Sequence, residues 1–165
     1  MMLFLRVLLM ILFVVVLIQD VKSRAINIFL LPAILLCALF IRYKETGLYF
    51  TSVYLYNAIF LFVVFFVLSL YFSIRKKMLW NPFKDSMGIG DLLFFIAVIP
   101  LFDLHSYMYF FIIGLVFSMV VHLLVKSIKK SKDSTTVPLA GYLSLFLMID
   151  LSIEMVSGKN FLLEI

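Results

Sequence analysis

The sequence contains very little cysteine and very little charge, and both shortages narrow what the chain can be. Its single cysteine, Cys37, excludes an internal disulfide and any zinc site built from several cysteines. Charged residues make up only 14% of the 165 residues, whereas 65% are hydrophobic, far from the balance of a soluble domain. We therefore expect one membrane domain over residues 1–165, with the apolar length used for membrane spans.

Six hydrophobic segments account for most of the chain. They cover residues 1–18, 26–41, 48–74, 88–102, 107–125 and 137–153. Their lengths predict an all-α integral membrane protein with about six transmembrane helices. The fourth segment is short, so a loop or a re-entrant segment is an alternative for part of it. Cys37 lies inside the second segment, where it is expected to be a small buried hydrophobe.

The basic residues lie between these segments and predict their orientation. The net charge of +5 would suggest a nucleic-acid partner in a soluble protein, but here its placement indicates membrane topology and no nucleic acid. If the N-terminus is outside, the cytoplasmic loops hold ten of the fourteen Lys and Arg residues. Because positive residues favour the cytoplasmic side, we expect both termini to lie outside the cytoplasm.

Two aspartates stand at the boundaries of hydrophobic segments. Asp20 follows the first segment, and Asp91 opens the fourth within the run Gly88-Ile89-Gly90-Asp91. A carboxylate at a membrane boundary is costly, so it needs a reason. The predicted topology puts both aspartates at the cytoplasmic level of the membrane, which favours a single carboxylate pair.

Such a pair suits hydrolysis by an activated water molecule. Two neighbouring carboxyls cannot both ionise, so one keeps a proton while the other acts as a base on a shared water. This chemistry requires no metal and no cofactor. Helix dipoles favour the proton on Asp20, near a helix C-terminus, and the charge on Asp91, near a helix N-terminus. Gly88 and Gly90 would permit a tight turn and the approach of a substrate strand.

Other interpretations of the same residues stay open. Asp91 could cap a helix after a glycine-rich turn, and Asp20 could be an interfacial acid paired with Lys22 or Arg24. A small transporter or channel subunit would use the two acids as ion or proton ligands. Against that class, the acids sit at a boundary, and no pair of broken helices indicates an inverted repeat.

Three stretches resemble those of a known family. Residues 20–26, DVKSRAI, are similar to the first aspartate motif of the prepilin peptidases, the aspartyl leader peptidases with a GxGD motif. Residues 88–91 are similar to their second motif, and residues 137–141, VPLAG, resemble a proline-containing stretch at the start of the family's last span. The chain departs from the family at Asn27-Ile28, where members commonly have Pro-Asn, and at Leu93, where a basic residue is usual.

The resemblance implies that Asp20 and Asp91 are the catalytic pair, with the neighbouring motif residues at the substrate approach. Those neighbours are Gly88, Gly90, Lys22 and Arg24. It implies an aspartic endopeptidase that removes the short basic leader of a prepilin-like or pseudopilin-like membrane protein. The expected location is the cytoplasmic face of a bacterial or archaeal inner membrane. Larger members carry paired cysteines in an N-terminal region that accompanies methylation, so we expect a peptidase without methyltransferase activity. A catalytically silent relative that acts in assembly is the remaining alternative.

Several polar residues outside the motifs are expected to have other roles. Arg6 is expected to reach the nearer interface, and Asp150 with Glu154 to form an interfacial acid pair remote from the site. His122 is expected to be an interfacial histidine, with a place at the site as the alternative. Residues expected to be solvated in loops are Asp85, Asp103, His105 and Asp133. Residues expected in interfacial aromatic belts are Tyr43, Tyr49 and Trp80.

Overall fold

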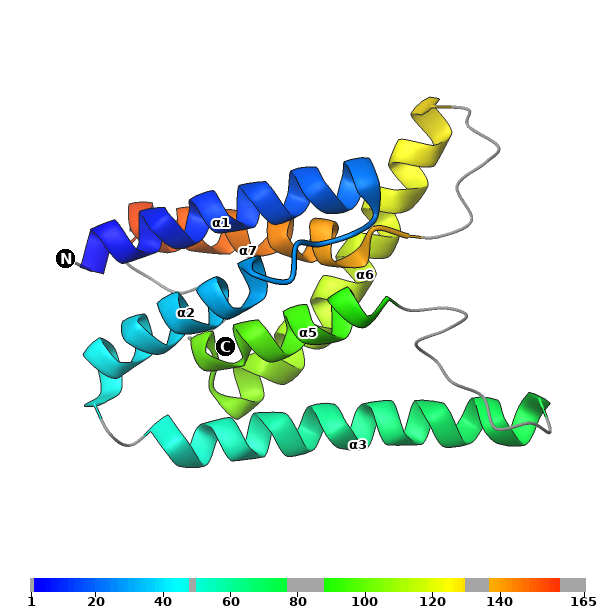
Figure 1. The fold of residues 1–165 in the computed structure, drawn as a ribbon, viewed down its shortest axis with the longest axis horizontal. Helices are drawn as coiled ribbons and strands as arrows, with labels where there is room; N and C mark the ends of the chain where they lie inside the picture. Colours follow the sequence, from blue (N-terminus) through cyan, green and yellow to red (C-terminus); the bar gives the residue numbers. More distant parts are fainter. Residues whose placement is uncertain (1, 48–49, 77–87, 130–136, 158–165) are drawn as a thin grey trace.

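The computed structural model describes residues 2–47, 50–76, 88–129 and 137–157, and within these ranges the chain is helical with no strand (Figure 1). The elements are α1 (Met2–Ser23), α2 (Leu30–Thr46), α3 (Phe50–Lys76), α5 (Ile89–Val98), the 3₁₀ turn η2 (Ile99–Leu101), α6 (Leu104–Lys129) and α7 (Leu139–Ser157). The all-α prediction is confirmed. Asp85, Asp133, Tyr49 and Trp80 lie outside the described residues.

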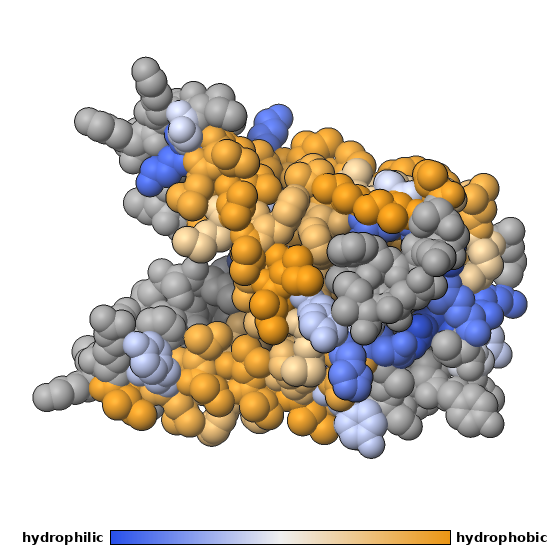
Figure 2. Space-filling view, turned by 180° about the vertical axis from the view of Figure 1, so that it is seen from behind, coloured by the Kyte–Doolittle hydropathy of each residue, from blue (hydrophilic) through white to orange (hydrophobic). Residues whose placement is uncertain are grey.

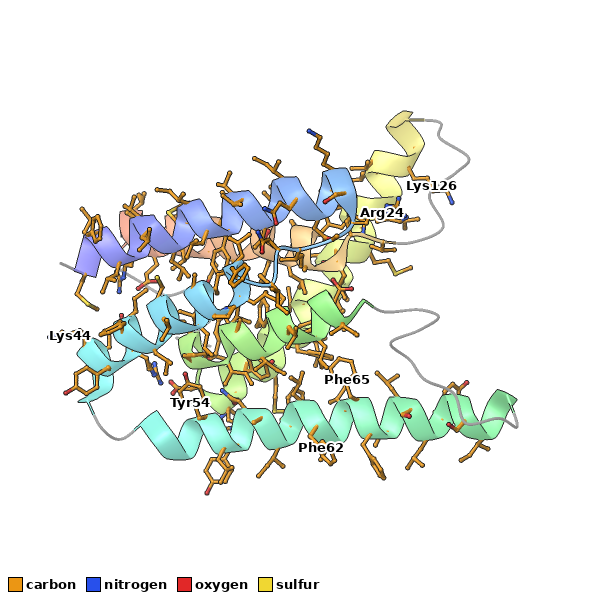
Figure 3. All side chains as sticks on the ribbon, in the orientation of Figure 1. Arg24, Lys44, Tyr54, Phe62, Phe65 and Lys126 are labelled. Carbon is orange, nitrogen blue, oxygen red and sulfur yellow. The ribbon has the colours of Figure 1, made fainter. Side chains whose placement is uncertain are left out.

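Four of these helices are long and apolar enough to cross a membrane. They span Met2–Ser23, Tyr54–Tyr71, Leu104–Ser127 and Leu139–Val156. Large apolar side chains are exposed along them, as in α3, where Phe62 is 69% exposed and points away from the other helices (Figure 3). Hydrophobic residues also dominate the face drawn in Figure 2. Apolar exposure on this scale suits contact with lipid and indicates a membrane-embedded protein.

The second and fourth predicted segments form shorter helices. α2 has 17 residues, and α5 has ten before the chain tightens into η2. Pro100 lies in this turn and has no backbone N–H to continue an α-helix. The fourth segment begins at the end of the bundle where α1 ends, and its helix is shorter than the four long helices (Figure 1).

The core joins α1 and α7 to α2 and α5. α1 lies along α7 and α2, and α2 also packs on α5. Phe13 of α1 is fully buried, and its ring lies 6.0 Å from that of Phe94 in α5. Because lipid is as apolar as these side chains, close van der Waals contact between the rings, and not removal from water, favours packing of α1 against α5.

An aromatic cluster packs the turn between α5 and α6 against the first half of α3. The rings of Phe102 and Phe110 are stacked with centroids 4.9 Å apart. The Tyr107 hydroxyl donates a hydrogen bond to the Phe95 carbonyl at 3.1 Å, and the Asn57 side-chain amide of α3 donates one to the Phe102 carbonyl at 2.9 Å. These bonds satisfy the buried Tyr107 hydroxyl and the Asn57 amide nitrogen, and they tie the far end of α5 to α6 and α3.

The opposite end of α1 from Asp20 carries a network of ion pairs. Arg6 pairs with Glu154 at 2.6 Å and with Glu45 at 2.9 Å, and Arg42 pairs with Asp103. The expectation that Asp103 is simply solvated is wrong, because its partly exposed carboxylate binds Arg42. Arg6 is likewise held by acids of α2 and α7. Arg6, Glu45 and Glu154 line an open cavity of about 40 Å³ together with Arg42 and Asp150.

Candidate functional site

Asp20 lies in the last turn of α1 and is only 6% exposed. The Arg24 amide donates a hydrogen bond to the Asp20 carbonyl at 3.0 Å and so closes the final turn of the helix. Arg24 has φ +53°, in the left-handed region that helices usually enter through glycine. The chain therefore turns sharply just after Asp20, and Arg24 lies at the end of the bundle opposite Lys44 (Figure 3).

Asp91 lies in the first turn of α5, three residues after Gly88, whose backbone is extended. The Gly88 amide donates to Asp91 Oδ2 at 3.3 Å, and the Asp91 amide donates to the Gly88 carbonyl at 3.1 Å. Gly88 is therefore the N-cap residue, and Asp91 is the third residue of the helix, where one of its carboxyl oxygens completes a capping box. The second oxygen, Oδ1, accepts a hydrogen bond at 3.0 Å from the Ala140 amide of α7.

The first turn of α7 brings the two aspartates together. The Gly141 amide donates to Asp20 Oδ2 at 2.6 Å, next to the Ala140 amide that donates to Asp91. Two carboxyls held by consecutive amides are neighbours, and the charge of Asp20 acts on Asp91. The predicted pairing of Asp20 with Asp91 is present in the structure.

The N-terminus of α7 explains why negative groups gather there. The first amides of a helix have no partner within the helix and lie at its positive end, so they bind carboxylates. Both Asp20 and Asp91 use this helix end, so the dipole of α7 acts on both carboxyls. The dipoles of α1 and α5 are thus only part of the local field. The expectation of a proton on Asp20 and a charge on Asp91 considers those two dipoles without that of α7.

Gly141 fits the site because it has no side chain. A Cβ at this position would lie 3.2 Å from both Cβ and Oδ2 of Asp20. That separation is tighter than ordinary van der Waals contact, so any larger residue would push against the Asp20 carboxyl. Gly141 therefore permits the short hydrogen bond to Asp20.

The electrostatics of Asp91 follow from its surroundings. Asp91 lies outside the four long apolar helices. Burial raises the pKa of Asp91 to about 6, with the hydrogen bond from Ala140 opposing the rise and the charge of Asp20 adding to it. A carboxyl with a pKa in this range exchanges its proton readily near neutral pH, and a neighbouring pair titrates as one unit.

The two predicted glycines have different surroundings. A Cβ on Gly90 would lie 3.4 Å from Cδ1 of Ile26, which belongs to the loop after α1. The space beside Gly90 that was expected for a substrate strand therefore adjoins this loop. The nearest side-chain atom to a Cβ on Gly88 would be Asp91 Oδ2, at 3.5 Å. Ile26 thus packs beside Gly90 in the first turn of α5, while Gly88 is exposed.

The remaining motif residues lie just after Asp20, at the end of α1 and in the turn that follows it. Lys22 and Arg24 are exposed, and the charge of Arg24 acts on Asp20. At the departure from the family motif, the Asn27 amide donates to Gln19 Oε1 at 3.0 Å, and the Asn27 side chain accepts from the Phe29 amide at 3.2 Å. Asn27 therefore organises the turn into α2.

The contribution of Ala140 and Gly141 to the site was missed, because a backbone amide leaves no side-chain signature. The only signal was the resemblance of residues 137–141 to a family stretch. Within the described ranges, no group of three or more His, Cys, Asp or Glu residues could hold a metal ion. Comparisons with protein-family models, with curated proteins and with solved structures find no match to this chain.

Proposed function

We propose that the protein is a membrane-embedded aspartic endopeptidase that hydrolyses a peptide bond with water activated between Asp20 and Asp91. The observation that carries this proposal is the placement of the two carboxyls on consecutive amides of α7. The site has the composition that the reaction needs, because two acids are neighbours and burial raises the pKa of Asp91 to about 6.

In the proposed reaction the pair shares one proton. The ionised carboxylate removes a proton from the bound water, and the water oxygen attacks the carbonyl carbon of the scissile bond. The protonated carboxyl donates a hydrogen bond to the carbonyl oxygen as negative charge develops there. The carbon–nitrogen bond then breaks, and the amine leaves with a proton that the pair supplies.

The proposed substrate is a prepilin-like or pseudopilin-like membrane protein with a short basic leader. The motif resemblance over residues 20–26 and 88–91 supports this class. The end of α1 and the starts of α5 and α7 lie at one end of the bundle, as a site at a membrane boundary requires (Figure 1). A boundary site fits a scissile bond between a leader in water and an apolar helix in lipid.

The proposed topology has about six membrane-crossing segments, both termini outside, and the site facing the cytoplasm of a bacterial or archaeal inner membrane. Ten of the fourteen Lys and Arg residues fall in the loops on the proposed inner side. Arg24 and Lys126 lie at the end of the bundle that holds the site, whereas Lys44 lies at the other end (Figure 3).

The direct test is cleavage of a leader-bearing substrate by the purified protein in detergent. We expect two products, with mass spectrometry locating the cut between the basic leader and the apolar segment, and no inhibition by a metal chelator. A panel of leader-bearing substrates left intact would contradict the peptidase. Proton or cation flux in liposomes that depends on Asp20 and Asp91 would instead indicate the transporter alternative.

A further inference from the structure

Two polar atoms of α6 are buried close to the start of α7. Ser118 Oγ and His122 Nδ1 make no hydrogen bond within the part of the chain that the structure describes. Ser118 is only 1% exposed. Residues four apart on a helix share one face, so these two side chains are neighbours. An unpaired buried polar atom is costly, so two on one face require an explanation.

His122 contacts the turn that holds the aspartates. Its ring lies 6.3 Å from that of Tyr142, between centroids, at an interplanar angle of 52°. Tyr142 directly follows Gly141, whose amide binds Asp20. The charges of Asp20 and Arg24 both act on the Tyr142 hydroxyl. A continuous series of contacts therefore runs from His122 through Tyr142 and Gly141 to Asp20.

α6 and α7 also pack closely against each other near the contact between His122 and Tyr142. A Cβ on Gly114 would lie only 2.7 Å from Cδ2 of Leu143, so the two helices approach closely there. One turn further along α7, the rings of Phe117 and Phe146 lie 5.3 Å apart. With the two helices this close, His122 contacts Tyr142, the residue that follows the amide bound to Asp20.

We infer that Ser118 and His122 bind one buried water molecule and act as positioning residues for Asp20. A water can bridge the Ser118 hydroxyl and His122 Nδ1, because both groups can donate or accept a hydrogen bond. The bridged His122 ring then holds Tyr142 in place, and Tyr142 keeps the Gly141 amide on the Asp20 carboxyl. The expected effect on catalysis rests on the proposed function, whereas the expected effect on the hydrogen bond from the Gly141 amide to Asp20 does not.

The variants that test this inference are Ser118→Ala, His122→Phe and the conservative His122→Gln, whose side-chain amide can still bind a water. The matched control is His105→Phe, because His105 is exposed and precedes the aromatic cluster at the other end of α6. The first readout is the amide resonance of Gly141 in protein labelled with ¹⁵N-glycine. The chain has six glycines, and Gly141→Ala identifies the resonance by its loss.

We expect Ser118→Ala and His122→Phe to shift the Gly141 resonance, and His122→Gln and His105→Phe to leave it nearly unchanged. In the cleavage assay, His122→Phe should lower kcat about tenfold with little change in KM, because misplacing Asp20 affects the reaction more than substrate binding. A crystal structure should show one ordered water bonded to both atoms.

The inference is overturned if neither Ser118→Ala nor His122→Phe moves the Gly141 resonance. A crystal structure with no ordered water bonded to Ser118 Oγ and His122 Nδ1 would overturn the water site. The resonance readout does not depend on cleavage, so an unshifted resonance contradicts the inference alone, whereas an inactive wild-type protein contradicts the proposed function alone. If His122→Phe fails to fold, the smaller change Ser118→Ala gives the same test.

Discussion

Asp20 and Asp91 accept hydrogen bonds from consecutive backbone amides, those of Gly141 and Ala140 at the start of α7. The two acids belong to different helices, and neither helix alone sets the distance between them. The turn that begins α7 does so, and it lies in the third stretch of the motif resemblance. The proposed peptidase site depends on this backbone turn as much as on its two acids.

The first prediction concerns the missing side chain of Gly141. Gly141→Ala should lower kcat roughly a hundredfold, because its Cβ would lie 3.2 Å from the Asp20 carboxyl and displace it. Thermal melting in detergent is the folding control. Cleavage close to that of the wild type would show that Asp20 tolerates displacement, and the amide would lose its role in the site.

The second prediction concerns the backbone of Arg24. Since φ is +53°, Arg24→Gly should be more stable than Arg24→Ala by about 1 kcal/mol, because only glycine adopts this conformation without a steric cost. Both variants lose the guanidinium, so the comparison isolates the backbone. Denaturant unfolding of the two proteins in the same detergent measures the difference. Equal stabilities would contradict the left-handed conformation.

The third prediction concerns pH. The pKa of Asp91 is raised from its ordinary value of 3.8 to about 6, so folding favours its protonated form. The contribution of Asp91 to stability is fully present below the unfolded pKa and is lost as pH rises through about 6. The melting temperature of Asp91→Asn should therefore gain on that of the wild type between pH 4 and pH 7, in the window that these pKa values set. A difference that stays constant over this range would contradict the raised pKa.

The fourth prediction separates stability from activity. Arg6 pairs with Glu45 and Glu154 at roughly 20 Å from Asp20 along α1. Arg6→Gln should lower the free energy of unfolding by about 1–3 kcal/mol, because it leaves two partly buried acids without their shared partner. The kcat of the folded fraction should stay within about twofold of the wild type. A large loss of kcat in fully folded protein would mean that the ion pairs of Arg6 influence the aspartate site, and it would contradict this prediction.

The pairing of the aspartates could be predicted from sequence, because apolar segments and basic loops place residues at a membrane level. The backbone amides of Ala140 and Gly141 that hold the two acids could not be predicted, since almost every residue has a backbone amide. The pairing of Arg6 with Glu154 was also out of reach, because it depends on how α1 and α7 pack against each other. At Gly90 the motif predicted room for substrate, but the neighbour in the structure is Ile26, a contact that only the path of the loop after α1 determines.

The most direct test of the two-aspartate site is the cleavage rate of Asp20→Asn, Asp91→Asn and the double variant, with Asp103→Asn at the opposite end of the bundle as the matched control. Asparagine keeps the shape of each carboxyl but cannot share the proton. We expect each single variant to lose cleavage, the double variant to be no worse than either, and Asp103→Asn to stay active, because the pair acts as one unit. A single variant at position 20 or 91 that kept most of its activity would contradict the paired-carboxylate mechanism.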